Sequence, residues 1–200
     1  MESKAFDTCM SRVWDNEGVK IGEDGIVLKD GAYSADGTHT RFGIAWEYNK
    51  EILRHLCGIT SGEQMSTLTL DEAEQIYKLK YWNKCGAEKA SLLSVNLAYQ
   101  LFDSAVNQGV SASVKILQDV LKSCGADIQV DGKFGPKTEG SLFDTVGGFP
   151  HKILLEFFKC RRRQEYYETL FDRCRRTPDE QEALFDRFEK SWMRRIGVEV

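Results

Sequence analysis

Glu17 is the residue of this sequence best placed to donate a proton. It stands at the end of a predicted helix, just before Gly18, a residue type common at helix ends. A carboxyl group there can be partly buried and still face a cleft, and burial disfavours the charged form of a carboxyl. Such a group can protonate a glycosidic oxygen. Taken alone, however, a glutamate at a helix end is more often a solvated or capping residue.

Three polar residues share one face of a later predicted helix. Tyr99, Asp103 and Asn107 follow one another at intervals of four residues, so their side chains project on the same side. Such a stripe can give hydrogen bonds to the hydroxyl and N-acetyl groups of a sugar. In the alternative, Asp103 and Asn107 satisfy nearby backbone groups of a buried helix. We favour that alternative for Asp103, which would brace the loop near Glu17, and weigh the two equally for Asn107.

Aromatic side chains supply a second kind of sugar contact, because their faces stack on sugar rings. Tyr33, Phe42 and Trp46 lie after Glu17 in a segment rich in polar residues and are candidates for this role. Tyr81 and Trp82 are better interpreted as core or as the wall of a cleft.

Metal and thiol chemistry receive little support. The three histidines, His39, His55 and His151, show none of the spacings of a zinc hydrolase. We therefore expect neither a metal nor another cofactor. The six cysteines contain no Cys-x-x-Cys pair, and a chain of 200 residues needs no disulfide scaffold. Free, mostly buried thiols are the expected state.

The composition is typical of an ordered protein and indicates neither nucleic-acid binding nor membrane insertion. Only 3 prolines and no low-complexity run occur, and 42% of the residues are hydrophobic. The net charge of −4 gives no case for binding nucleic acid. No apolar stretch is long enough to span a membrane, so no stable membrane insertion is expected. Residues 1–19 contain no signal-peptide core, which predicts synthesis in the cytoplasm.

The elements that must position these residues are mostly helices. The sequence Asp24-Gly25 between two short apolar segments predicts a hairpin after Glu17. Thr69 and Glu72 form a capping-box pattern that starts a helix through Trp82. A further helix is expected near 91–108, ended by Gly109, and the next is expected to start after Ser111 as its cap. Three more helices are expected: one that starts at Pro136, one over 150–176, and one from Pro178 to about 195. This pattern predicts a mainly α fold with one small hairpin near the N-terminus.

Several of these segments, in this order, resemble glycoside hydrolase family 108, the N-acetylmuramidases found among phage endolysins and proteins once called secretion activators. The helix ending in Glu17-Gly18 is followed by a polar loop and then by Thr40-Arg41-Phe42-Gly43-Ile44. The similarity continues through a helix ending in Tyr-Trp and through a Phe-Asp-x-Ala-Val-Asn-x-Gly core. It ends with a peptidoglycan-binding pattern and two closing helices. In chain order, the Tyr-Trp helix is 70–82, the core motif is 101–109, the binding pattern lies within 117–138, and the closing helices contain 163–167 and 192–196. The second glycine and the tyrosine that follow the family's catalytic glutamate are absent here.

The resemblance implies a lysozyme-like fold and a set of roles. Glu17 would be the catalytic acid. Asp36, with Asp30 as the competing choice, would be the carboxylate that orients or activates water, and Thr40 would help to position that water. A water, or less readily a carboxylate, would attack the anomeric carbon, and the sequence does not choose between inversion and retention.

We therefore expect a hydrolase that cleaves the bond between N-acetylmuramic acid and N-acetylglucosamine in peptidoglycan. Residues 1–108 would form the catalytic part, and residues 109–200 a helical peptidoglycan-binding-like part packed on it. The glycan strand is the expected partner, reached through a holin, another export route or lysis. The alternatives are a non-catalytic peptidoglycan-binding protein and a lytic transglycosylase that uses the same glutamate; a cysteine amidase has no local signature.

Overall fold

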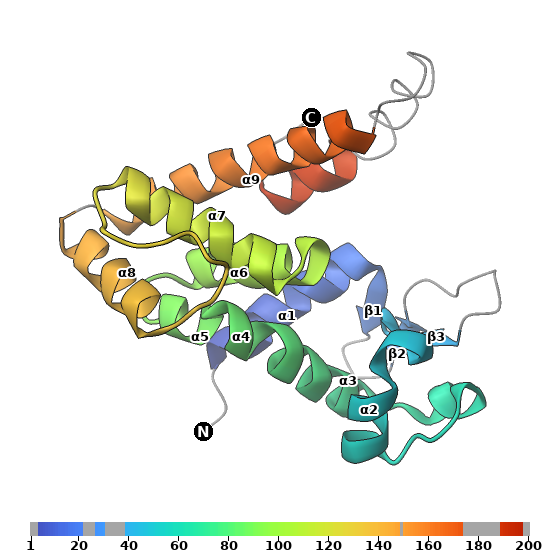
Figure 1. Cartoon of the computed structure of the whole chain (residues 1–200). Coiled ribbons are helices and arrows are strands. Elements are labelled where there is room, and N and C mark those ends of the chain that lie inside the picture. Colours follow the sequence, from blue (N-terminus) through green and yellow to red (C-terminus); the bar gives the residue numbers. More distant parts are fainter. Residues whose placement is uncertain (1–3, 22–26, 31–38, 149, 174–188, 198–200) are drawn as a thin grey trace. The chain divides into compact units, whose positions relative to one another are not determined.

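The computed structural model describes residues 4–21, 27–30, 39–148, 150–173 and 189–197 (Figure 1). The chain divides into two compact units, Met1–Trp82 and Asn83–Val200. Each unit is described by itself below.

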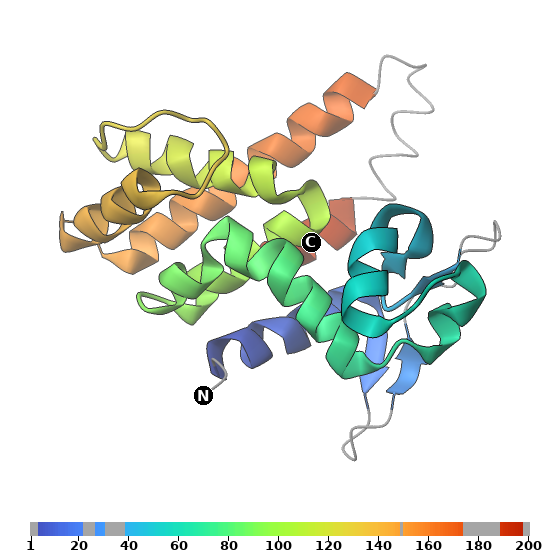
Figure 2. The same ribbon diagram turned by 60° about the horizontal axis from the view of Figure 1, so that its bottom comes forward.

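The first unit begins with the helix that carries Glu17. Helix α1 (Lys4–Glu17) buries one apolar stripe, formed by Phe6, Cys9, Met10, Val13 and Trp14. Strands β1 (Val19–Ile21) and β2 (Val27–Asp30) follow as an antiparallel pair, with Val19 opposite Asp30 (Figures 1 and 2). The predicted hairpin is confirmed in its two strands, while its Asp24-Gly25 turn lies outside the described residues.

A second, very short hairpin follows. Strands β3 (Thr40–Arg41) and β4 (Ile44–Ala45) pair in antiparallel fashion and are joined by Phe42 and Gly43 alone. Helix α2 (Trp46–Cys57) and the 3₁₀ helix η1 (Gly62–Thr67) come next.

Helix α3 (Leu70–Tyr77) starts at the predicted capping box. The Thr69 hydroxyl accepts from the Glu72 amide, and the Glu72 carboxylate accepts from the Thr69 amide at 2.8 Å. The helix continues as a π-helical turn, η2 (Lys78–Trp82), whose Trp82 packs edge-on against Phe6 at 5.4 Å between ring centroids. A hydrogen bond of 3.1 Å from the Trp14 indole to Glu74 also joins α1 to α3. These contacts form the core of the first unit.

Every element that the structure describes in the second unit is a helix. They are α4 (Asn83–Cys85), α5 (Ala87–Ser91), α6 (Val95–Gln108), α7 (Val110–Ser123), α8 (Pro136–Gly148) and α9 (His151–Arg173), followed by helical residues 189–195. In Figure 1, α9 runs alongside α7, with which it is in contact. The fold is therefore mainly α with a small hairpin near the N-terminus, as predicted; the second hairpin, β3–β4, was not predicted.

Two helix starts differ from the sequence prediction. The helix expected near 91–108 begins only at Val95, because the Ser94 hydroxyl accepts from the Leu97 amide and starts a new helix. Helix α7 begins directly after Gly109, so Ser111 lies inside its first turn and is not its cap. Pro136 does stand at the first position of α8, as predicted. No helix of the described residues is long and apolar enough to cross a membrane.

Candidate functional site

Glu17 ends α1 half-buried, with its carboxylate directed at the β3–β4 turn. A methyl group placed on Gly43 would lie 3.8 Å from Glu17 Oε2. The structure therefore brings the candidate acid together with the Thr-x-aromatic-Gly segment, which lies more than twenty residues further along the sequence.

The turn beside Glu17 has a backbone that few sequences adopt. Phe42 and Gly43 have φ values of 51° and 71°, the left-handed pair that two-residue hairpins of type I′ require. The Tyr77 hydroxyl donates to the Phe42 carbonyl at 3.0 Å. A Cβ atom at position 43 would approach that hydroxyl to 2.8 Å. Glycine is thus favoured at position 43 both by the backbone angle and by the lack of space.

Tyr77 and Tyr81 form the helical side of this site. Their rings lie 5.5 Å apart between centroids. Burial raises the pKa of the Tyr81 phenol, and the nearby negative charge of Glu17 raises it further. Tyr81 belongs to the π-helical turn η2, and such turns occur frequently at functional sites. The sequence prediction treated Tyr81 as core or cleft wall and gave Tyr77 no role; the Tyr-Trp ending of this helix was the signal that pointed here.

Thr40 lies on β3, at the edge of a hollow of about 280 Å³. His39 and Arg41 of the same segment line this hollow, facing the 3₁₀ helix η1. His39 Nε2 lies 3.8 Å from a carboxylate oxygen of Glu63, and the Arg41 guanidinium donates to the Ser66 carbonyl. The walls of the hollow are therefore polar and carry a positive charge on Arg41 and a negative charge on Glu63.

Two predicted site residues, Tyr33 and Asp36, lie outside the described residues. Asp30, the competing carboxylate, lies on β2. It pairs with Val19 of β1, and Val19 follows Glu17 by two residues. The roles of Asp36 and Asp30 stay predictions.

Phe42 does not offer its ring to a ligand in this structure. Its side chain is fully buried and lies 6.1 Å from the Trp14 ring, between centroids. The expectation that Phe42 stacks on a sugar is therefore corrected: the ring packs in the core and holds the turn beside Glu17. Trp46 is also buried.

In the second unit, Asp103 lies at the centre of a buried polar network. Its carboxylate pairs with Arg162 of α9 and, at 3.0 Å, with Arg195. Asp103 and Arg162 are fully buried, and Gln100 joins them by accepting from Arg162 at 2.8 Å and donating to the Arg195 carbonyl at 2.9 Å. Asp103 is therefore a buried structural residue, as we favoured, but the partners seen here are arginine side chains; a brace on the loop near Glu17 stays a prediction.

The two neighbours of Asp103 on the predicted stripe differ in their surroundings. Tyr99 is half-buried. Asn107 is exposed, and its carbonyl oxygen accepts from the Tyr166 hydroxyl at 3.1 Å. Burial raises the pKa of that Tyr166 phenol, so the hydroxyl keeps its proton at neutral pH. A sugar-binding role for Tyr99 and Asn107 stays a prediction.

A second candidate site lies at the Asp131-Gly132-Lys133 loop. The buried Gln118 side chain of α7 holds this loop from one side. Its amide nitrogen donates to Asp131 at 2.8 Å, to the Thr138 hydroxyl at 3.0 Å and to the Lys133 carbonyl at 3.1 Å, and its oxygen accepts from the Gly132 amide at 2.8 Å. The loop is therefore rigidly positioned.

A groove of about 660 Å³ runs along this loop. Lys122, Lys133 and Lys137 line it together with Asp127 and Asp131. The hydrogen bond from Gln118 lowers the pKa of the Asp131 carboxyl. Lys122 and Lys137 form no ion pair within the described part of the chain, so their charges are available to a ligand. The groove can accept a polar, anionic group.

Metal and thiolate chemistry remain unsupported. Among the described residues, no cluster of histidine, cysteine, aspartate and glutamate could hold a metal ion. The five cysteines in the described ranges are free thiols. Burial raises the pKa of Cys9 to about 12 and that of Cys57 to about 11, so neither forms the reactive thiolate at neutral pH.

Comparison with known proteins identifies the two parts of the chain. Residues 24–109 match the family described as glycosyl hydrolase 108, and residues 112–196 match a predicted peptidoglycan domain. No curated protein matches the chain. Among solved structures, that of Brucella abortus SagA is similar, with 23% identity, a TM-score of 0.57, and coverage of 96% of this chain and 88% of that one. This likeness shows a shared fold.

The chain thus contains two successive segments, each of which matches one family model. It combines a glycosyl hydrolase 108 domain with a predicted peptidoglycan domain, which confirms the resemblance found in the sequence.

Proposed function

We propose that the chain is an N-acetylmuramidase that hydrolyses the bond between N-acetylmuramic acid and N-acetylglucosamine, with Glu17 as the general acid. The observation that supports this role is the position of the Glu17 carboxylate, 3.8 Å from the Cβ position of Gly43. Gly43 lies inside the segment that matches glycosyl hydrolase 108, whereas Glu17 precedes the start of that match at residue 24. The proximity of Glu17 to this segment supports its proposed role as the acid.

In this mechanism the Glu17 carboxyl protonates the leaving glycosidic oxygen, and a water attacks the anomeric carbon from the opposite face. Asp36 is the proposed carboxylate that activates the water, and Thr40 positions it. No cofactor takes part. The Tyr77–Phe42 hydrogen bond keeps the turn beside Glu17 in place, which holds the reacting groups in one geometry.

The groove at the Asp131–Lys133 loop is the proposed contact with the wall in the second part of the chain. Lys122, Lys133 and Lys137 would bind carboxylates of peptidoglycan, a polymer that carries them on its peptides and muramic acid groups. A holin or another export partner is the proposed route by which the chain reaches the wall.

The deciding experiment compares digestion of purified peptidoglycan by the wild type and by Glu17→Gln, with the products identified by mass spectrometry. We expect reducing muramic acid ends from the wild type and a loss of at least about 100-fold in the variant, because general acid catalysis contributes at least that much. The control is Glu51→Gln, which changes an exposed glutamate of α2.

Other products would support other functions. Ends in the 1,6-anhydro form would identify a lytic transglycosylase. No products from the wild type, together with retained wall binding, would identify a non-catalytic peptidoglycan-binding protein. Full activity of Glu17→Gln would remove Glu17 from the mechanism.

A further inference from the structure

The groove at the Asp131–Lys133 loop contains charges of both signs. Its charged residues are Lys122, Asp127, Asp131, Lys133 and Lys137. All five side chains are exposed, and among the residues that the structure describes none of the five forms an ion pair. The groove therefore presents both ammonium and carboxylate groups to whatever enters it.

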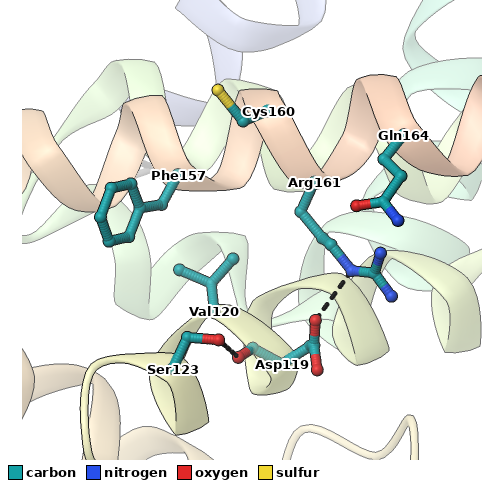
Figure 3. Close-up of a pocket in the computed structure, with 7 residues that line it drawn as sticks. All are labelled: Asp119, Val120, Ser123, Phe157, Cys160, Arg161 and Gln164. Atoms are coloured by element: carbon teal, nitrogen blue, oxygen red, sulfur yellow. Dashed lines mark hydrogen bonds and ion pairs between the residues drawn. The ribbon is translucent and has the colours of Figure 1, made fainter.

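A smaller hollow of the same unit, between α7 and α9, has the opposite arrangement (Figure 3). Its volume is about 230 Å³, against about 660 Å³ for the groove. The charged residues that line it are Asp119 and Arg161, and these two pair with each other at 2.8 Å. Charge in that hollow is neutralised within the chain, whereas charge in the groove is matched by solvent ions or by a ligand.

The loop that carries two of the groove charges is already ordered. Gly132 separates Asp131 from Lys133 and has a φ of 76°, which favours glycine. A side chain at position 132 would collide with Ser111 of α7. Gln118 ties the same loop to α7 through its hydrogen bonds to all three loop residues. A ligand therefore meets a loop that does not have to be ordered on binding, which lowers the entropic cost.

The two carboxylate oxygens of Asp131 differ in their contacts. Oδ1 accepts from the Gln118 amide at 2.8 Å and from the Lys133 backbone amide at 2.9 Å. Oδ2 accepts no hydrogen bond from the part of the chain that the structure describes. The hydrogen bond from Gln118, followed by that from Lys133, lowers the pKa of the carboxyl, so it is charged at neutral pH. Asp131 can therefore bind an ammonium group through Oδ2 while Oδ1 keeps the loop in place.

Positive charge gathers near the start of α8. Pro136 and Lys137, the first two residues of this helix, line the groove together with Lys133. The amino end of a helix carries a partial positive charge, which adds to the charges of the two lysines. Carboxylate groups of a ligand are therefore favoured here.

A ligand that matches the groove carries an ammonium group and carboxylates together. The glycan strand of peptidoglycan lacks ammonium groups, because its amino sugars are N-acetylated. Its peptide stems carry free carboxylates and the side-chain amine of a diamino acid. Cross-linking converts that amine into a neutral amide and removes its charge. The volume of the groove lies within the range of roughly 300–1,000 Å³ that is usual for small-ligand sites, which suits the end of one stem.

We propose that the groove binds uncross-linked peptide stems of peptidoglycan, with the free side-chain ammonium group on Asp131 and stem carboxylates on Lys133 and Lys137. The proposal rests on the wall-binding role proposed above for this groove, and it selects the peptide rather than the glycan as the bound part. Attachment of the chain then depends on the fraction of stems that are not cross-linked.

The proposal is tested by NMR of the ¹⁵N-labelled full chain during titration with L-alanyl-γ-D-glutamyl-meso-diaminopimelate. We expect the amide signals of Gly132 and Lys133 to shift. Acetylation of the side-chain amine of this tripeptide should weaken binding about three- to fivefold, the upper range for an exposed ion pair. Chitotetraose, a glycan without peptide, should leave these signals unchanged.

Asp131→Asn removes the charge, and its amide oxygen can still accept from Gln118 and Lys133. We expect this variant to bind the free and the acetylated tripeptide with equal affinity. The control is Asp119→Asn, which removes a carboxylate outside the groove and should keep the preference for the free amine. The same spectra show whether each variant is folded.

Three results overturn the proposal: no shift with the tripeptide, equal affinity of the wild type for the free and acetylated tripeptides, or equally tight binding of free meso-diaminopimelate. Shifts with chitotetraose alone also overturn it, but they leave the groove as a contact with the wall. None of these measurements depends on catalysis. The proposal can therefore fail while the function of Glu17 stands, and a failed digestion assay leaves the titration result unaffected.

Discussion

The surroundings of Glu17 are defined by single residues whose replacement has predictable effects. Gly43 approaches both Glu17 and the Tyr77 hydroxyl, and its φ of 71° favours glycine. Gly58, at the end of α2, has a similar φ of 66° but no atom within 4 Å of the place where a Cβ would stand. The two glycines therefore separate the effect of backbone strain from that of crowding.

We predict that Gly43→Ala lowers the free energy of unfolding by about 2–4 kcal/mol and also reduces activity. Left-handed backbone in a residue with a Cβ costs about 1–2 kcal/mol, and the contact with Tyr77 adds to this. Gly58→Ala should cost only about 1–2 kcal/mol and leave activity unchanged. Urea unfolding and the peptidoglycan digestion assay measure the two effects. Equal losses in both variants would show that position 43 is not crowded.

A second prediction concerns the charge interaction between Glu17 and Tyr81. Burial raises the pKa of Tyr81 first, and the Glu17 charge raises it further. Glu17→Gln removes that charge, so the pKa of Tyr81 should fall but stay above the ordinary value for tyrosine. NMR titration with ¹³Cζ-labelled tyrosine measures this shift, and Glu51→Gln is the control. An unchanged Tyr81 titration would place Glu17 too far from Tyr81 to interact.

At the scale of elements, the second unit is held together by charge as well as by apolar packing. Asp103 of α6 binds Arg162 of α9 and also Arg195 of the helical residues 189–195. Tyr166 stacks on Trp192 at 4.5 Å between ring centroids, so two of these segments, α9 and the helical residues 189–195, also meet through their aromatic rings. A buried carboxylate that loses one of its cations is costly, because water cannot replace the lost partner.

We predict that Arg162→Met destabilises the chain by about 3–5 kcal/mol, the usual cost of breaking a buried ion pair from one side. The adjacent variant Arg161→Met removes half-exposed ion pairs with Asp119, Glu165 and Glu168 and should cost about 1 kcal/mol or less. Urea unfolding followed by circular dichroism compares the two. Similar small losses would mean that Arg195 alone neutralises Asp103.

At the scale of the whole molecule, the chain joins a hydrolase domain to a peptidoglycan domain. Glu17 lies in the first compact unit, and the groove with Lys122 and Lys137 lies in the second. If the groove holds the polymer while Glu17 acts on the glycosidic bond, the two activities can be weakened separately.

We predict that the double variant Lys122→Glu and Lys137→Glu binds insoluble peptidoglycan at least about tenfold more weakly, because a carboxylate ligand would then meet like charges. Hydrolysis of short soluble glycan fragments should be unchanged. The control, Lys84→Glu with Lys152→Glu, changes the net charge equally at exposed lysines outside the groove. Co-sedimentation measures binding, and equal loss in both double variants would point to net charge alone.

The local features of this protein follow from short stretches of sequence. The apolar stripe of α1, the Thr69–Glu72 capping box and Pro136 at the start of α8 all involve residues within one or a few helical turns of each other. Such features depend on local hydrogen bonds and periodicity, so the sequence predicts them well. Ser111 misled the prediction because a serine can cap a helix only where the helix begins, and α7 begins two residues earlier.

Other features depend on residues that are far apart in the chain. The Phe42 ring is buried against Trp14, and the Tyr77 hydroxyl binds the Phe42 carbonyl. No spacing rule predicts these contacts, and Phe42 therefore passed for a sugar-binding residue. Asp103 likewise finds Arg162 and Arg195 at separations of 59 and 92 residues.

By itself, the sequence determined the helical class, the hairpin after Glu17 and the resemblance to a peptidoglycan hydrolase, because these rest on local pattern and ordered motifs. Only the tertiary structure decided which polar residues are buried and which face solvent. It moved Phe42 into the core and set the Gly43 turn beside Glu17. The physical reason is that burial is decided by which distant segments pack together, and that choice is made by the whole chain.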